Sequence, residues 1–148
     1  NRVNTNSGWP DKISGYNLWS WWSLLFSLWN FLAILFKMID SYEFGSIVID
    51  GKKYDYDVIV YKGKVSSWWR DTSHNVSIND IDDLVKEKPK IIVFGTGASG
   101  VMDVPKETED YIKGKGIEVI ILRTGEATRK FNELSKTADV AAAIHLTC

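Results

Sequence analysis

The segment Lys90–Gly100 reads K-I-I-V-F-G-T-G-A-S-G and indicates the architecture of the chain. An apolar run, Ile91–Phe94, is followed at once by three glycines within six residues. A run that is apolar on both faces is typical of a central strand in a sheet that is covered on both sides. The glycines predict a turn at the carboxyl end of that strand, where open α/β sheets tend to bind small ligands.

On both sides of this segment, strand and helix patterns alternate. Strands are predicted at Ser46–Asp50, Asp57–Tyr61, Lys64–Trp68, Ile117–Leu122 and Val140–Leu146, and helices after Ser77, at Lys106–Lys113 and from Gly125 to Lys136. Asp50-Gly51 is a strong hairpin signal and is expected to join the first two of these strands. The order predicts an α/β fold with a mixed central sheet, helices on its faces and an antiparallel hairpin region at the start.

Two helix starts are predicted from capping residues. Ser77 is followed three residues later by Asp80, which favours a helix that runs to Glu87 and stops before Pro89. Thr124 is expected to cap the last helix, whose inward residues would be Ala127, Phe131 and Leu134.

The glycine turn matches G-x-G-x-x-G, the dinucleotide-binding pattern, but its surroundings do not fit. Pro105 interrupts the helix that should follow the third glycine, and no acidic residue follows Leu122 to hold a ribose. The backbone N–H groups of such a turn can still hold an anion. We therefore take Gly95, Thr96, Gly97 and Thr124, together with Arg70 and His74, as a candidate ligand-binding set at the carboxyl ends of the strands.

Residues for catalysis or metal binding are few. Cys148 is the only cysteine, and His74 and His145 are the only histidines. These three can in principle form a Cys–His pair or a three-ligand zinc site, but their spacing does not favour either. His145 is expected to be a core histidine with a hydrogen-bond partner, and Asp55 and Asp57 to share the solvent-facing side of a strand. No catalytic residue, metal site or cofactor is predicted.

Trp68-Trp69-Arg70 is a distinctive cluster. Adjacent residues on a strand point to opposite faces, so one tryptophan should fill the core while the other remains near the surface as a candidate interaction anchor. Arg70 can stack on an indole ring or bind a carboxylate.

The first 37 residues form a different kind of sequence. They hold five of the seven tryptophans, and the 23 residues from Ser14 to Phe36 carry no charge. Three explanations stay open: a membrane anchor, a helix packed on the domain, or an extension that is not native, with Met38 as the native start. A cytoplasmic location is expected for residues 38–148, with membrane attachment if the N-terminal segment is real.

Charge argues against one class of partner. The whole chain has a net charge of −1. Four charged residues, Arg2, Lys12, Lys37 and Asp11, lie in the first 37 residues, so residues 38–148 carry 15 basic and 18 acidic residues. A domain with this acidic balance is not expected to bind nucleic acid through its phosphates. Its 111 residues are enough for one modest core.

Several short motifs carry a resemblance to a known family. They are Phe44-Gly45, Trp69-Arg70 with His74, Gly95-Thr96-Gly97, Val104-Pro105, Thr124–Ala127, Phe131-Asn132 and Ile144–Cys148. On these, Met38–Cys148 resembles a small domain family of unknown function (DUF498-type), whose eukaryotic relatives include a mitochondrial complex I assembly factor. The resemblance implies a three-layer α/β fold with no established enzymatic activity.

Two functions follow as expectations. The first is a non-catalytic protein-interaction or assembly-factor-like module that holds a protein partner near Trp68 and Trp69. The second is small-ligand or anion binding, with weak enzymatic activity as an extension, at the glycine turn.

Overall fold

The computed structural model describes residues 21–26 and 38–148. The chain divides into two units, Asn1–Ala33 and Ile34–Cys148, and the fold below is that of the second. The Trp-rich segment predicted at 1–37 lies outside the described residues, apart from a short helical stretch at 21–26. Among the described residues, none of the helices has the length and apolar character needed to span a bilayer.

The larger sheet has five strands in the order β5-β4-β8-β6-β7. Their bounds are β4 Val58–Tyr61, β5 Lys64–Ser67, β6 Ile91–Thr96, β7 Glu118–Leu122 and β8 Val140–His145. β8 runs parallel to β6 and antiparallel to β4, so the sheet is mixed, as predicted. Every residue of β6 and β8 is buried, which confirms that the apolar run at Ile91–Phe94 is a central strand.

The smaller sheet is an antiparallel meander of β1 Ile39–Glu43, β2 Ser46–Ile49 and β3 Lys52–Tyr54. Asp50 and Gly51 both have positive φ, 48° and 78°, as the tight hairpin turn requires. The predicted turn is therefore confirmed, but its predicted partner strand is wrong. The turn joins β2 to β3, a short strand that the sequence pattern did not reveal, and Asp57–Tyr61 contributes to the larger sheet instead.

Three helices follow the predicted pattern: α2 Ile78–Lys86, α3 Lys106–Gly114 and α4 Thr124–Ser135. At the start of α2, the backbone N–H of Ser77 donates to the Asp80 carboxylate at 2.8 Å, the acidic half of the expected capping arrangement. The expected cap of the last helix is wrong, because Thr124 is itself the first residue of α4 and Arg123 takes the cap position.

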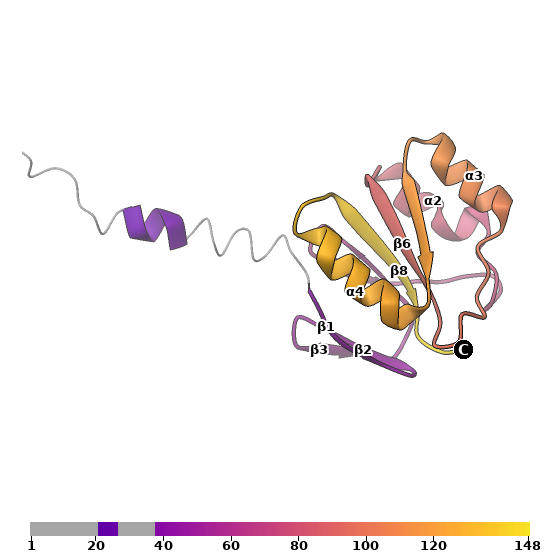
Figure 1. Cartoon of the computed structure of the whole chain (residues 1–148), viewed down its shortest axis with the longest axis horizontal. Helices are drawn as coiled ribbons and strands as arrows, with labels where there is room; N and C mark the ends of the chain where they lie inside the picture. Colours follow the sequence, from indigo (N-terminus) through magenta and orange to yellow (C-terminus); the bar gives the residue numbers. More distant parts are fainter. Residues whose placement is uncertain (1–20, 27–37) are drawn as a thin grey trace, which may run out of the picture. The chain divides into compact units, whose positions relative to one another are not determined.

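Two cores enclose the larger sheet and give the fold its three layers (Figure 1). One core packs α2 and α3 against one face of the sheet, with Ile81, Ile112 and Phe94 among its members. The other packs α4 and the smaller sheet against the opposite face, through Phe131 and Ile47. The predicted α/β class with a mixed sheet between helices is confirmed, and the hairpin region is part of the second covering layer.

Candidate functional site

The residues after β8 lie on the glycine turn that follows β6. Ala98 donates its N–H to the Thr147 carbonyl at 3.2 Å, and Val101 donates to the Cys148 carbonyl at 3.4 Å. Gly97 has a φ of +101°, and a Cβ built there would collide with the Thr147 carbonyl oxygen. A glycine is therefore required at position 97 both by its conformation and by the close approach of residues 147–148.

Thr124 holds the turn to the end of β8. Its Oγ1 accepts a hydrogen bond from the Gly97 N–H at 2.8 Å and donates to the His145 carbonyl at 2.6 Å. The hydroxyl is directed at these two buried partners, and no side-chain hydrogen bond caps the helix. The two β-strand ends and the start of α4 are thereby fixed relative to one another.

An ion pair that the sequence did not predict lies beside the turn. The carboxylate of Asp57 contacts Arg70 Nη2 and His145 Nδ1, both at 2.7 Å, and accepts the Leu146 N–H at 2.8 Å. The prediction that Asp57 shares a solvent-facing strand side with Asp55 is wrong. Asp57 lies between β3 and β4, where it is half-buried because three donors converge on it, whereas Asp55 is exposed.

These donors decide the charge state of Asp57. Burial raises the pKa of this carboxyl, but the hydrogen bonds from His145, the Leu146 N–H and Arg70 together hold it below its usual value. His145 is buried, and it has the hydrogen-bond partner that the sequence analysis expected. Because a carboxylate only accepts hydrogen bonds, His145 Nδ1 is the donor in this contact, and Nε2 is the ring nitrogen left for another partner.

The two tryptophans follow the end of β5 at Ser67, so the prediction that they lie on this strand is wrong, but one is buried and the other exposed, as predicted. Trp68 is buried and donates its indole N–H to the Asp80 carbonyl at 2.9 Å, whereas Trp69 is 85% exposed. The guanidinium of Arg70 stacks on the Trp68 ring, with its carbon 4.3 Å from the ring centroid. Arg70 therefore does both things that the sequence allows, stacking on an indole and binding a carboxylate.

His74 and Cys148 complete the site. The Cys148 Sγ lies 3.2 Å from the His74 Nε2, and the rings of His74 and His145 meet edge to face with centroids 6.0 Å apart. His74, His145 and Cys148 each offer one ligand atom, and these atoms lie within 4.8 Å of one another. Within the described ranges, this is the group of residues that could hold a metal ion.

All six residues of the predicted ligand-binding set meet around residues 145–148. Thr124 donates to the His145 carbonyl, and Gly97 lies against the Thr147 carbonyl. Gly95 packs against Thr124 and Ile144, and Thr96 donates to the Leu122 carbonyl beside them. Arg70 contacts the His145 ring, and His74 contacts the Cys148 thiol. The prediction did not include Asp57, His145 and Cys148. The signal that could have found two of them is the ending His145-Leu146-Thr147-Cys148, which stands directly after a buried strand.

A family model covers almost the whole of this domain. The model described as "Protein of unknown function (DUF498/DUF598)" matches residues 39–145. The chain belongs to the DUF498/DUF598 family. The matched range confirms the resemblance seen in the sequence motifs, and it begins at the first strand of the smaller sheet.

Several solved structures are similar to this domain in fold. The conserved hypothetical protein PH1505 from Pyrococcus horikoshii is 28% identical with a TM-score of 0.69, over 74% of this chain and 98% of that one. The protein MT938 is 29% identical with a TM-score of 0.65, over 76% and 100%. A Bordetella pertussis protein described as a Mth938-like domain is 15% identical with a TM-score of 0.62 over 74% and 85%, which shows the fold alone.

Proposed function

We propose that this domain is a non-catalytic protein-interaction module whose contact face surrounds residues 145–148. The observation that carries the proposal is the position of three exposed apolar side chains, Phe44, Trp69 and Val101, which are 69%, 85% and 50% exposed. Each belongs to a segment that is bound to residues 145–148.

The hydrogen bonds define this arrangement. Gly45, next to Phe44, donates its N–H to the Leu146 carbonyl at 2.9 Å. Arg70, next to Trp69, lies 3.1 Å from the His145 ring. Val101 itself donates to Cys148. Three loops that are distant in the sequence are thus anchored at one end of β8, and each carries an exposed apolar side chain.

A contact face of this composition suits a protein partner. Exposed apolar side chains that gather at one place mark interaction sites, and Trp is enriched among the residues that dominate binding energy. The support beneath Trp69 is rigid, because Trp68 and Arg70 on either side of it are held by the core and by Asp57. Ordered neighbours lower the cost of fixing the backbone at position 69 when a partner binds. A partner with a complementary apolar surface, of the kind an assembly factor holds, is the expected occupant.

We do not propose ligand binding at the glycine turn as a second function. The N–H groups of Gly97, Ala98 and Val101 already donate to Thr124 and to residues 147–148. An anion would therefore have to displace the chain's own carbonyl groups from these donors.

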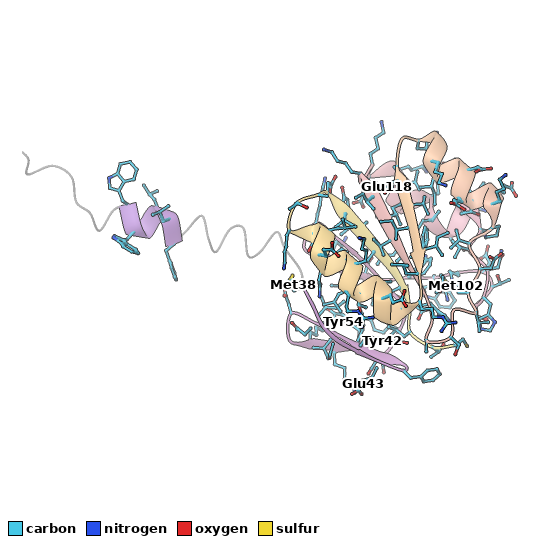
Figure 2. All side chains as sticks on the ribbon, in the orientation of Figure 1. Met38, Tyr42, Glu43, Tyr54, Met102 and Glu118 are labelled. Carbon is cyan, nitrogen blue, oxygen red and sulfur yellow. The ribbon has the colours of Figure 1, made fainter. Side chains whose placement is uncertain are left out.

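The proposal is tested by affinity capture from the native cell, with quantitative identification of the retained proteins. Trp69→Ala and Phe44→Ala should each lose the same retained partner, by about tenfold or more for a residue that dominates binding. Met38→Ala, made in the full chain of 148 residues so that translation does not start at Met38, is the matched control. Met38 is also an exposed apolar residue, but it lies at the far side of the domain from Met102, the neighbour of Val101 (Figure 2).

The partner must then bind the purified domain directly, with the same ranking of variants in a titration. Equal retention of every partner by the wild type and both variants would contradict the proposal. So would a loss of binding that the Met38→Ala control shares.

A further inference from the structure

We propose that His74, His145 and Cys148 form a binding site for a divalent transition-metal ion, zinc by the chemistry of its donors. Two imidazole nitrogens and one thiolate are ligands that Zn²⁺ accepts in proteins. This inference rests on the side-chain cluster and is independent of the apolar contact face proposed above.

The separation of the donor atoms fits one ion. Zn–N and Zn–S bonds of about 2.0–2.3 Å in a tetrahedral site place ligand atoms about 3.3–3.6 Å apart. The His74 Nε2 and Cys148 Sγ are already 3.2 Å apart, and all three ligand atoms fall within 4.8 Å. His74 is exposed, so its side chain can change rotamer to adjust these separations.

His145 has the outer support that metal-binding histidines typically have. Its Nδ1 donates to the Asp57 carboxylate at 2.7 Å, which fixes the ring orientation and leaves Nε2 as the ligand atom. Nε2 faces the Thr147 hydroxyl at 3.5 Å, a long contact that an ion can replace. Asp57 would act here as a positioning residue, because it reaches the metal only through His145.

The backbone that carries the other two ligands is held in place without a metal. The His74 carbonyl accepts the Asp103 N–H at 2.8 Å, and the Cys148 carbonyl accepts the Val101 N–H. Gly97, by lacking a side chain, lets residues 147–148 approach the turn. The glycine turn would thus shape the site by seating Cys148, without contacting the ion itself.

Charge and exposure also favour an ion at this place. Asp57 neutralises Arg70, the cation that contacts His145, so that the positive charge of the guanidinium is compensated before an ion binds. Three protein ligands leave one coordination position of a four-coordinate zinc ion, and one of the three ligands, His74, is exposed to solvent. A water molecule is the expected fourth ligand in the isolated domain.

A Cys–His nucleophile pair is the competing interpretation of the same cluster. It accounts for the contact between His74 and Cys148. It gives no role to the second histidine, which is oriented by a carboxylate and lies in edge contact with the first. A metal site uses all three residues, so the observations favour it.

The test is a titration of the metal-free full chain with Zn²⁺ by calorimetry, and with Co²⁺ by absorption spectroscopy. One ion per chain is expected. The Co²⁺ form should show a thiolate-to-cobalt charge-transfer band together with the visible bands of a four-coordinate ion. Because the chain contains no other cysteine, a thiolate band can come only from Cys148.

Variants assign the ligands. His74→Ala and Cys148→Ser should each weaken Zn²⁺ binding by more than about 100-fold, since loss of an outer partner alone costs about 10–100-fold. Asp57→Asn should weaken it by about 10–100-fold while keeping the thiolate band. Ser99→Ala, an exposed change in the glycine turn, is the matched control and should bind like the wild type.

His74 is exposed, so its variant is expected to fold even if His145→Ala does not. Circular dichroism checks folding in each case. Absence of a thiolate band in the wild type would overturn the proposal, as would unchanged Zn²⁺ affinity in His74→Ala and Cys148→Ser. Rapid alkylation of Cys148 that is suppressed by His74→Ala, and unaffected by Zn²⁺, would overturn it in favour of the nucleophile pair.

Discussion

Asp57 and His145 lie 88 residues apart in the sequence and share a hydrogen bond of 2.7 Å. Asp57 precedes β4, and His145 ends β8, the strand that pairs with β4. Through this bond and the ion pair with Arg70, three distant segments are held at one end of the sheet. The stability of the domain should therefore depend on the charge at position 57.

Asp57→Ala should lower the free energy of unfolding by about 3–5 kcal/mol, because it leaves the guanidinium of Arg70 buried without its counter-charge. Urea unfolding measures the change. Asp55→Ala removes an exposed carboxylate two residues away and should stay within about 0.5 kcal/mol of the wild type. Similar losses in the two variants would show that the Arg70 pair adds nothing specific.

Trp68→Ala should destabilise the domain strongly, whereas Trp69→Ala should leave its stability nearly unchanged. Trp68 packs against Phe94 in the core and hydrogen-bonds Asp80, so its removal should cost about 3–5 kcal/mol. Trp69 is 85% exposed and should change stability by less than about 0.5 kcal/mol. Thermal and urea unfolding of both variants give the comparison. A large loss in Trp69→Ala would place that side chain in the fold and weaken its role as a partner anchor.

Gly97→Ala should destabilise the domain more than Gly51→Ala. Both glycines have positive φ, which costs an alanine about 1–2 kcal/mol. Gly51 has open space where a Cβ would lie, whereas at Gly97 the Cβ would meet the Thr147 carbonyl. Overpacking adds about 1–3 kcal/mol at position 97. Urea unfolding of the two variants tests this, and equal losses would mean that residues 147–148 move away at no cost.

The difference in the free energy of unfolding between the wild type and Tyr61→Phe should change with pH in the alkaline range. Burial and the hydrogen bond to the Asp139 carboxylate raise the pKa of Tyr61 to about 12, above its value of about 10 in the unfolded chain. The folded state therefore holds this proton more tightly. The stabilisation of the folded state by this protonated hydroxyl is fully present below about pH 10 and is lost as the pH rises towards 12.

The measurement for Tyr61 is urea unfolding of the wild type and Tyr61→Phe between about pH 8 and 11.5. Titrating lysines affect both proteins equally, so only the difference between them is interpreted. The wild type should be the more stable protein near pH 8, and its advantage should shrink as the pH rises. A constant difference across this range would contradict the assignment.

The sequence predicted the central part of the fold because that part is decided by burial. Ile91–Phe94 and Val140–Leu146 are apolar on both faces, which in this length range is typical of central strands. The Ser77/Asp80 pair marks the start of α2, and Pro89 marks the region where it must end, both through local backbone chemistry. Such signals depend on neighbouring residues and can be read directly from the chain.

The smaller sheet was less visible for a physical reason. β1 and β3 are short and mostly exposed, with the sequences I-D-S-Y-E and K-K-Y, so they carry no clear alternation. The turn at Asp50-Gly51 was recognised, but a turn predicts only that the chain reverses. It does not tell which later strand continues in the same sheet.

The candidate site was the part that sequence alone could predict least. Asp57 has the same chemistry as the exposed Asp55, and only the arrival of Arg70 and His145 from elsewhere distinguishes it. Thr124 looked like a helix cap because local sequence cannot show that its hydroxyl serves Gly97 and His145 instead. Contacts between residues so far apart depend on the finished topology.

The position of β8 in the sheet has a consequence for how the protein is made. β8 lies between β4 and β6, so the pairs β4–β5 and β6–β7 have no direct contact through the sheet until residues 140–145 are in place. A chain synthesised from its N-terminus therefore carries two open strand edges until β8 has been translated. Closing the sheet then joins segments with large sequence separation, a step that slows folding. Stopping translation before residue 140 would leave both edges free to pair with other chains.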